Sequence, residues 1–223
     1  MDQSTSIRAS WEANAANWIE TIVNNEIESR VLVTNEAIVQ AVLAVSPASV
    51  LDIGCGEGWL TRLLRSKGID AYGVDAVASL IKYAIEKDGP FYAVASFREL
   101  ADGSTQMKKK AAAVINFALL DESDTDMLIN NLHLLVEPGG SVIIQTLHPL
   151  VIAMQEPYVS GWKNGSWNGM KRDFEQPYQW YFRTLQDWVK LFGQAGLTVR
   201  SIGEPLHPST QKPASLIFTL QLQ

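Results

Sequence analysis

The chain has 223 residues, 47% of them hydrophobic and 19% charged, with a formal net charge of −6 at pH 7. This length can bury the core of one domain, and this composition is that of a soluble globular protein. The acidic balance argues against a general nucleic-acid or anionic-membrane surface, no apolar stretch approaches the ~20 residues of a membrane span, and one cysteine excludes an internal disulfide. Because the N-terminal residues also lack a signal-peptide layout, we expect a cytoplasmic protein.

Two helices are predicted before the first strand. Trp11, Ala15 and Trp18 fall on one helical face, so residues 9–25 are predicted to form an amphipathic helix. A second helix is predicted at about 34–45, because a Ser-Pro pair follows it and stops the helix.

A strand, a glycine-rich turn and a helix come next. The short apolar run 50–53 predicts a buried parallel strand, and a helix is predicted at about 57–67. Gly54, Gly56 and Gly58 turn the chain between them, since glycine adopts unusual φ angles and lets a ligand approach the backbone. This order is typical of the opening unit of a nucleotide-binding α/β sheet.

The details of this turn disfavour a pyrophosphate ligand. A dinucleotide-binding fingerprint needs its third glycine at position 59, which holds Trp59. Glu57 also places a negative charge at the mouth of the helix, where it would repel a phosphate. The next strand, about 70–74, is followed by Asp75, and a carboxylate there can accept hydrogen bonds from both hydroxyls of a ribose. The sequence therefore predicts a site for a ribose that carries no phosphate.

The alternation of strands and helices continues to residue 146. We expect helices at about 77–87 and 123–136, and strands at about 91–95, 111–116 and 141–146. The carboxylates of Asp121 and Asp124 suit the start of the second of these helices, so we interpret them as capping residues. We interpret the lysines at 108–110 as a solvated turn and not as a nucleic-acid site.

Residues 147–183 break this rhythm. They hold eight of the 20 aromatic residues of the chain, with glycines between them. We interpret the segment as a cap over the substrate, because aromatic rings give a stacking surface and glycines permit movement. The alternative is a mini-core that covers the edge of the sheet. A helix at about 184–195 and an antiparallel pair of strands at about 197–203 and 214–222 end the chain.

Three segments in this order resemble the class I (Rossmann-like) S-adenosylmethionine (SAM)-dependent methyltransferases. They are Val50 to Gly58 with Asp75, Val114 to Leu120, and Leu135 to Ile144. The resemblance implies an α/β fold: a three-layer α/β/α sandwich whose seven-stranded, mostly parallel sheet has an antiparallel last strand.

The resemblance also implies how the chain is divided. Residues 1–46 would form an N-terminal helical lid, and residues 47–223 the methyltransferase domain, with the cap insert at about 147–183. In this family such a preface often lies over the SAM pocket, although Trp11 and Trp18 could equally well only pack the helices onto the body.

The family pattern assigns the cofactor site to the first two strands and their turns. Gly54, Gly56 and Gly58 would let the backbone meet the methionine and ribose parts of SAM. Asp52 would help to orient the amino group of SAM, and Asp75 would bind the ribose.

The remaining cofactor contacts are expected at the ends of the third and fourth strands. The family commonly has an acidic residue that meets the adenine amino group, but this chain has Ser96 and Phe97 there, so a hydroxyl, backbone groups and a ring would hold the base. Asn116 stands where the transferable methyl group should lie. Two further positions complete the predicted contacts: Ala76 and Phe117.

Two other side chains are candidates with an open alternative. His148 follows the last central strand at the functional edge, where imidazole could remove the proton of the acceptor, or it is simply held beside a proline turn. Arg30 could reach the methionine carboxylate by a bidentate pair, or it is a solvated surface arginine.

The sequence thus predicts an enzyme that transfers a methyl group from SAM to a small-molecule acceptor, aromatic or apolar, at oxygen, nitrogen or carbon. Residues 116–119 lack the Asn/Asp-Pro-Pro-Tyr signature of base methylation, and Cys55 lies in the glycine turn as a small filler. We predict no metal, nucleic-acid or membrane partner, and leave a homodimer open. The alternatives are a non-catalytic SAM-binding scaffold and an NAD-dependent oxidoreductase, which Glu57 and Trp59 disfavour.

Overall fold

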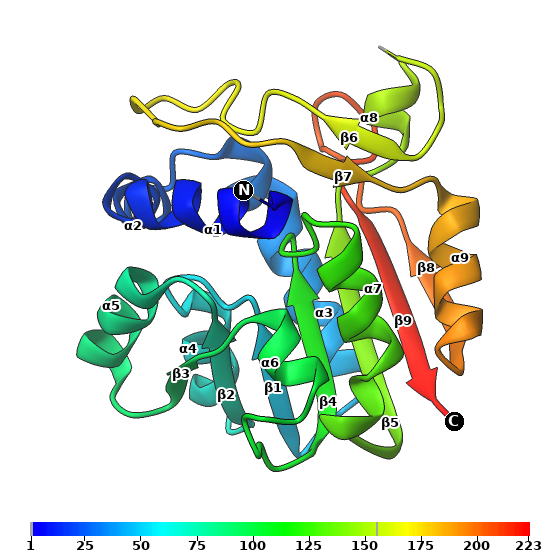
Figure 1. Cartoon of the computed structure of the whole chain (residues 1–223). Coiled ribbons are helices and arrows are strands. Elements are labelled where there is room, and N and C mark those ends of the chain that lie inside the picture. The colour runs from blue at the N-terminus through cyan, green and yellow to red at the C-terminus, as the bar shows by residue number, and fades with distance from the viewer. Residues whose placement is uncertain (1, 155) are drawn as a thin grey trace.

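The computed structural model describes residues 2–154 and 156–223. Its centre is a seven-stranded sheet in the order β3-β2-β1-β4-β5-β9-β8 (Figure 1). The strands are β1 (Ser49–Ile53), β2 (Asp70–Asp75), β3 (Tyr92–Val94), β4 (Lys110–Asn116), β5 (Val136–Thr146), β8 (Leu197–Gly203) and β9 (Leu216–Leu222). Pairs from β3 to β5 are parallel, whereas β9 is antiparallel to both β5 and β8, so the predicted sheet is confirmed.

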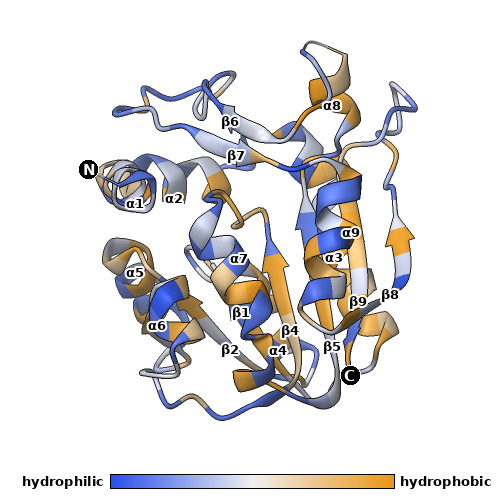
Figure 2. Ribbon diagram, turned by 45° about the vertical axis from the view of Figure 1, so that its right-hand side comes forward, coloured by the Kyte–Doolittle hydropathy of each residue, from blue (hydrophilic) through white to orange (hydrophobic). Residues whose placement is uncertain are grey.

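Helices cover both faces of this sheet, which makes the three layers that the sequence predicted. The helices α3 (Asn35–Ala44) and α4 (Trp59–Ser66) pack on one face, and α5 (Ala78–Asp88) lies beside β2 and β3. On the other face lie α6 (Phe97–Ala101), α7 (Ser123–Asn130) and α9 (Leu185–Gln194). In β1, Val50 belongs to the core on the first face, whereas Leu51 and Ile53 belong to the core on the second. Figure 2 shows the resulting hydrophobic sheet between helices with polar outer sides.

The N-terminal segment forms two helices, α1 (Gln3–Ala13) and α2 (Ala15–Val23), instead of the single helix predicted at 9–25. The chain breaks at Asn14, whose side chain donates hydrogen bonds to the carbonyls of Ser10 and Glu175 and accepts one from the Glu175 N–H. Asn14 therefore interrupts the helix and links this segment to residue Glu175 of the insert. Both helices lie across the carboxyl ends of the parallel strands (Figure 1).

The insert after β5 consists of α8 (Leu150–Ala153) and a hairpin of β6 (Gly161–Lys163) and β7 (Trp180–Phe182). Its Trp167 stacks on Phe174 at 4.6 Å between ring centroids and meets Trp11 of α1 edge-on at 4.9 Å. The Trp167 indole N–H also donates to Ser10 Oγ at 3.0 Å. Figure 1 shows the insert above α1 and α2, on the side away from the sheet. Its aromatic residues therefore build a mini-core on the N-terminal helices.

The predicted helix 123–136 is too long at its end. α7 stops at Asn130, a single 3₁₀ turn covers Leu132–Leu134, and β5 begins at Val136, five residues before the strand predicted at about 141–146. Gly140 lies so close to β4 that a Cβ atom there would be 2.6 Å from the Ala111 carbonyl oxygen. Among the described residues, no helix is both long and apolar enough to cross a membrane.

Candidate functional site

A cavity of about 500 Å³ lies between the carboxyl ends of the strands and the helices α1 and α2. Its volume is within the range of small-molecule and cofactor sites. Nine of the predicted cofactor residues line it: Asp52, Gly54, Gly56, Asp75, Ala76, Ser96, Phe97, Asn116 and Phe117. The topology thus gathers residues from four strand ends into one space. The cover over them is formed by the N-terminal helices.

The three glycines of the first turn are needed for different structural reasons. Gly54 has a φ of +74°, and a Cβ atom there would lie 2.3 Å from the Cβ of Ala118. Gly56 has a φ of +58° and lines the cavity, so its bare backbone faces any ligand. Gly58 does not line the cavity; a Cβ atom there would meet the Tyr92 ring at 2.6 Å, so this glycine serves packing and not ligand contact.

Asp75 is fixed by the backbone around it. One carboxylate oxygen accepts from the Gly56 N–H and the other from the Val77 N–H, each at 2.9 Å. A carboxylate has about four acceptor sites, so one on each oxygen stays free for a pair of hydroxyls. Burial raises the pKa of Asp75 to about 6, against the two backbone hydrogen bonds.

Asp52 lies beneath the turn on the neighbouring strand and is fully buried. Its carboxylate accepts a hydrogen bond from Thr61 Oγ1 of α4 at 2.7 Å. Burial raises the pKa of Asp52 to about 7, and the nearby carboxylates of Glu57 and Asp75 add to this shift. A bound cation would favour the ionised form of both aspartates.

Arg30 and Glu57 present opposite charges at the same end of the cavity. The Arg30 guanidinium lies 5.5 Å and 5.2 Å from the ring centroids of Trp18 and Trp59, and its Nε donates to Asn35 Oδ1 at 3.2 Å. Its Nη2 is buried without a hydrogen-bond partner in the part of the chain that the structure describes. Glu57 Oε2 accepts from the Trp18 indole at 3.1 Å, and Oε1 is similarly unpartnered. Burial lowers the pKa of Arg30, and Glu57 opposes this effect.

At the adenine position, Ser96 lines the cavity, but its hydroxyl is already used. Ser96 caps α6 in a reciprocal box with Glu99, donating to Glu99 Oε2 at 2.7 Å and accepting from the Glu99 N–H. A ligand would therefore meet the Phe97 ring more readily than this hydroxyl. At the end of β4, Asn116 Oδ1 is a buried acceptor without a partner among the described residues, and Phe117 turns the chain with a φ of +55°.

His148 does not line the cavity. Its Nδ1 accepts from the Leu150 N–H at 3.1 Å, so Nε2 carries the proton and donates to Glu204 Oε1 at 2.8 Å. Both ring nitrogens are thus engaged in the turn around Pro149, which is the alternative reading of this residue. Of the described residues in the predicted cap at 147–183, the cavity is lined by Leu147 alone. This geometry therefore gives no support to His148 as the general base, or to residues 147–183 as a direct cap over the substrate.

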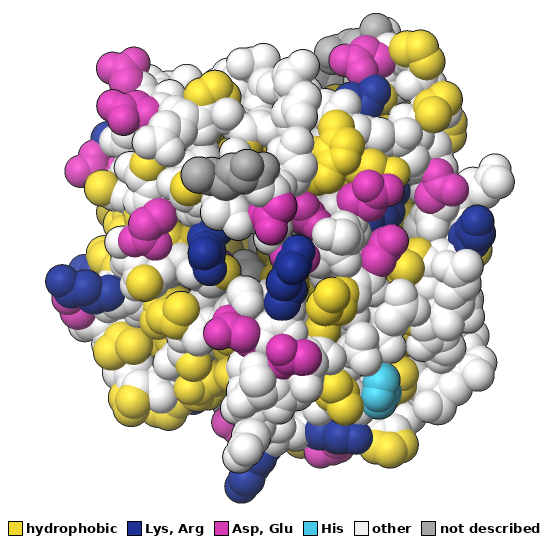
Figure 3. Space-filling view, in the orientation of Figure 1, with side chains coloured by type: hydrophobic (Ala, Val, Ile, Leu, Met, Phe, Trp, Pro, Cys, Tyr) yellow, Lys and Arg dark blue, Asp and Glu magenta, His cyan; other side chains and the backbone are white. Residues whose placement is uncertain are grey.

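The sequence did not identify the half of the cavity beyond Asn116. Here Asp121 and Asp124 lie with Arg98 of α6 and Ser4 of α1. Asp124 Oδ1 accepts from Arg98 Nε at 2.7 Å, and its Oδ2 accepts from Ser4 Oγ. Figure 3 shows charged side chains gathered on this face between the N-terminal helices and α6. Helix-capping chemistry explained the two aspartates at the level of sequence, and no local pattern shows that α1 folds back onto them.

The chain matches the family model described as "Methyltransferase domain" over residues 29–202. Over 104 residues it is 33% identical to the malonyl-[acyl-carrier protein] O-methyltransferase of Pseudescherichia vulneris, which covers 45% of this chain and 39% of that protein. Over 112 residues it is 32% identical to the mitochondrial ubiquinone biosynthesis O-methyltransferase of Mus musculus, covering 47% of this chain and 30% of that protein. The chain thus spans well under half the length of the curated relatives it matches.

The fold is shared over a longer stretch. The solved magnesium protoporphyrin IX methyltransferase of Synechocystis PCC 6803, with bound SAM, superimposes with a TM-score of 0.67 at 16% identity, over 100% of this chain and 98% of that one. The family model matches more than three quarters of the residues, and this range includes β1, the glycine turn and α4. The chain belongs to the class I, Rossmann-like family of SAM-dependent methyltransferases.

Proposed function

We propose that the protein transfers a methyl group from SAM to a small-molecule acceptor. The observation that carries this proposal is the pairing of charges at one end of the cavity. Arg30 Nη2 and Glu57 Oε1 are a buried donor and a buried acceptor without partners among the described residues. Buried polar atoms are rarely left unpaired, so a ligand with a carboxylate and an ammonium group fits them.

The rest of the cavity fits the other parts of SAM. Asp75 offers two free acceptor sites to a ribose, and Phe97 offers an apolar surface to a base. Asn116 lies in the partly apolar wall, and its Oδ1 is a buried acceptor that no described residue bonds. When bound, SAM supplies a methyl group that its sulfonium has already activated. The residues of the chain therefore mainly position the two reactants and keep water away.

The acceptor is proposed to be small. The cavity has a volume of about 500 Å³ and is covered on one side by α1 and α2, so the space beyond Asn116 suits a compact molecule. Both curated relatives are named O-methyltransferases, which favours an oxygen nucleophile.

A binding experiment tests the cofactor assignment. Calorimetry would compare S-adenosylhomocysteine with 5′-methylthioadenosine, which lacks the amino-acid group. Arg30→Ala is expected to weaken S-adenosylhomocysteine by at least about tenfold, since a hydrogen bond to a charged group contributes ~1.5–3 kcal/mol, and to leave methylthioadenosine within about threefold. The control is Arg200→Ala. Arg200 is exposed on β8 and donates a hydrogen bond to Gln221 of β9.

Transfer itself is measured with labelled SAM across a panel of small hydroxyl, amine and carboxylate compounds. Incorporation of label into an acceptor is the expected result. Stabilisation of the protein by NAD and not by SAM or S-adenosylhomocysteine would overturn the proposal. Tight SAM binding without transfer on broad panels would favour the scaffold alternative.

A further inference from the structure

We propose that Asp121 is a catalytic residue that accepts the proton of a hydroxyl nucleophile, so the acceptor of this cavity is an alcohol or a phenol. This inference deepens the proposed function and rests on it. It starts from one oxygen atom that the structure leaves available in the half of the cavity beyond Asn116.

The two oxygens of Asp121 have different surroundings. Oδ1 accepts from the Asp124 N–H at 2.8 Å and from Ser123 Oγ at 3.2 Å, and so it caps α7. No hydrogen bond from another described residue reaches Oδ2, which is not sealed in the core although the residue is only 7% exposed. Asp121 lines the cavity, and Oδ2 is the carboxylate oxygen that the cap of α7 leaves available.

The neighbouring carboxylate is not available in the same way. Both oxygens of Asp124 are engaged, one by Arg98 of α6 and the other by Ser4 of α1. Arg98 Nε is therefore engaged by Asp124, and Asp121 Oδ2 is the carboxylate oxygen of this pair that no other described residue bonds.

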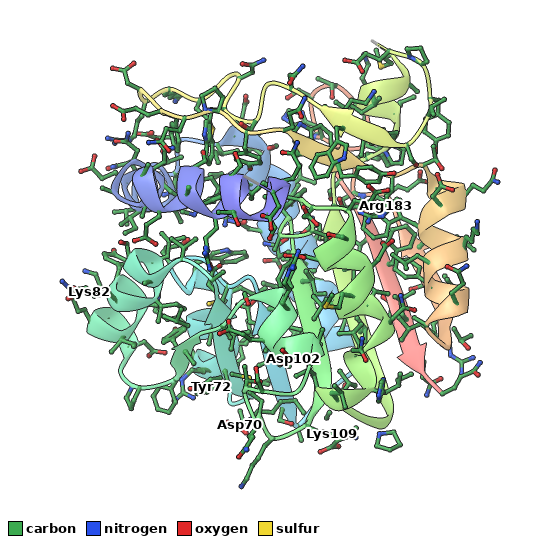
Figure 4. All side chains as sticks on the ribbon, viewed as in Figure 1. Asp70, Tyr72, Lys82, Asp102, Lys109 and Arg183 are labelled. Atoms are coloured by element: carbon green, nitrogen blue, oxygen red, sulfur yellow. The ribbon has the colours of Figure 1, made fainter. Side chains whose placement is uncertain are left out.

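The turn that carries Asp121 is held rigidly from outside the cavity. Arg183, with a side chain 4% exposed, donates to the carbonyls of Asp121 at 3.3 Å and Glu122 at 2.7 Å and pairs with Asp126 at 2.8 Å. The Tyr181 N–H of β7 donates to the Leu120 carbonyl at 2.8 Å. Figure 4 shows Arg183 where the end of β7 passes over α7. Arg183 is therefore a positioning residue, because a fixed carboxylate loses no freedom when it meets a nucleophile.

The lining of the cavity also bears on the class of acceptor. Ile7, Trp11, Phe97 and Leu120 provide an apolar and aromatic surface, and the cations Arg8 and Arg98 line the same cavity. An ionised carboxylate placed against Asp121 Oδ2 itself would meet a like charge, whereas a hydroxyl would donate to it. An alcohol or phenol fits both the wall and the free oxygen.

The step balances without a further reactant. The hydroxyl oxygen forms a bond to the methyl carbon as the bond from that carbon to sulfur breaks, and sulfur keeps the electron pair. The hydroxyl proton passes to Asp121 Oδ2, and then to solvent after the product leaves.

Three probes with one ring test the inference on the S-adenosylhomocysteine complex: phenol, anisole and benzoate. Anisole has lost the donor, and benzoate carries the repelled charge. NMR titration is expected to show phenol binding at least about tenfold more tightly than either of the others. In Asp121→Ser the hydroxyl can still cap α7 but the second oxygen is gone, so the preference should fall to within about threefold.

The control is Asp102→Ser, because Asp102 also caps a turn, accepting from the Ser104 N–H at 2.9 Å, but lies outside the cavity at the end of α6 (Figure 4). It should keep the tenfold preference. With an alcohol or phenol acceptor, Asp121→Ser should also lower kcat by about 10²–10⁴ with the affinity for SAM unchanged. Equal binding of the three probes, or a preference that survives in Asp121→Ser, overturns the inference. Failure to bind S-adenosylhomocysteine would instead count against the proposed function.

Discussion

At the scale of single residues, Asp75 shows how a strand end becomes a ligand site. The carboxylate is held by two backbone N–H groups, and burial raises its pKa to about 6. Ribose hydroxyls donate hydrogen bonds, so they bind the ionised form better than the neutral one. The affinity for SAM is therefore linked to the ionisation of this carboxyl group.

The pH dependence follows with a definite sign. Below about pH 6 a growing fraction of Asp75 is protonated and must lose its proton before it binds the ribose, so affinity falls as the pH falls. For one group with a pKa of about 6, the dissociation constant of SAM should decrease about tenfold from pH 5 to pH 7. Calorimetry in two buffers of different ionisation enthalpy would also detect the released proton. An affinity that stays constant over this range would exclude the linkage.

Removal of the same carboxylate is a second prediction. Asp75→Ala should weaken SAM by ~1.5–3 kcal/mol, which is the range for hydrogen bonds to a charged group. Calorimetry measures the change, and urea unfolding checks that the Gly56 turn, which Asp75 also holds, is still formed. Unchanged affinity in a folded variant would refute the role in ribose binding.

The site residues that can be identified from the sequence lie beside a predicted strand end or a glycine turn. Asp75 and Gly56 are placed by the strand and turn pattern, whatever the rest of the chain does. The sequence leaves the role of Arg30 open, because its partners Trp18 and Trp59 come from two helices whose packing no local pattern determines. It also leaves both a catalytic role and a proline turn open for His148, because the orientation of the ring depends on Glu204, which is 56 residues away.

At the scale of elements, the most instructive contact is the one by which Arg183 holds the turn between β4 and α7, which we call the clamp. Arg183 comes from the segment between β7 and α9, and it lies over the rings of Tyr181 and Trp188 at 4.8 Å and 5.0 Å. It satisfies carbonyl groups that the turn leaves open. The insert thereby contributes to the site indirectly, by holding a loop in place.

This clamp should be visible in stability. Arg183→Met keeps much of the apolar stem but leaves the two carbonyls and Asp126 without their donor, so the free energy of unfolding should fall by ~3 kcal/mol. Urea denaturation measures it, with Arg200→Met on the exposed surface as the control, expected within ~0.5 kcal/mol. If both variants lose a similar free energy of unfolding, the hydrogen bonds of Arg183 do not stabilise the protein more than those of a surface arginine.

Strands and most helices of the sheet were predictable within a few residues, because buried parallel strands have strong apolar runs and glycine or proline marks their ends. The short helix α6 and the strands β6 and β7 were not predicted. Their three to five residues give too little periodicity, and they exist because of contacts such as the bond from Tyr181 to Leu120.

At the scale of the whole molecule, the N-terminal helices close the cavity and the insert holds those helices. The predicted cap lies one layer further out than expected, since the aromatic residues of the insert face α1 and not the ligand site. Ion pairs of Arg172 with Glu20 and Glu26 join the same two parts. The cover of the site is thus a two-layer structure built from the N-terminal helices and the insert after β5.

Loss of one ring in this contact should loosen the cover. Trp167 is buried between Phe174 and Trp11. Trp167→Ala should destabilise the protein by about 3–5 kcal/mol, as large aromatic deletions do, and should expose α1 to limited proteolysis before the sheet unfolds. Val159→Ala, at a position 64% exposed in the same insert, is the matched control. Protease resistance of α1 in the Trp167 variant would contradict the described packing.

The same arrangement has a consequence for synthesis of the chain. Trp11 is synthesised about 150 residues before Trp167 and Tyr178, whose rings receive it in the fold. At about 5–20 residues per second this tryptophan waits roughly ten to thirty seconds for those partners. During translation the α1 segment therefore presents an unshielded aromatic face, which makes it a natural client for a chaperone.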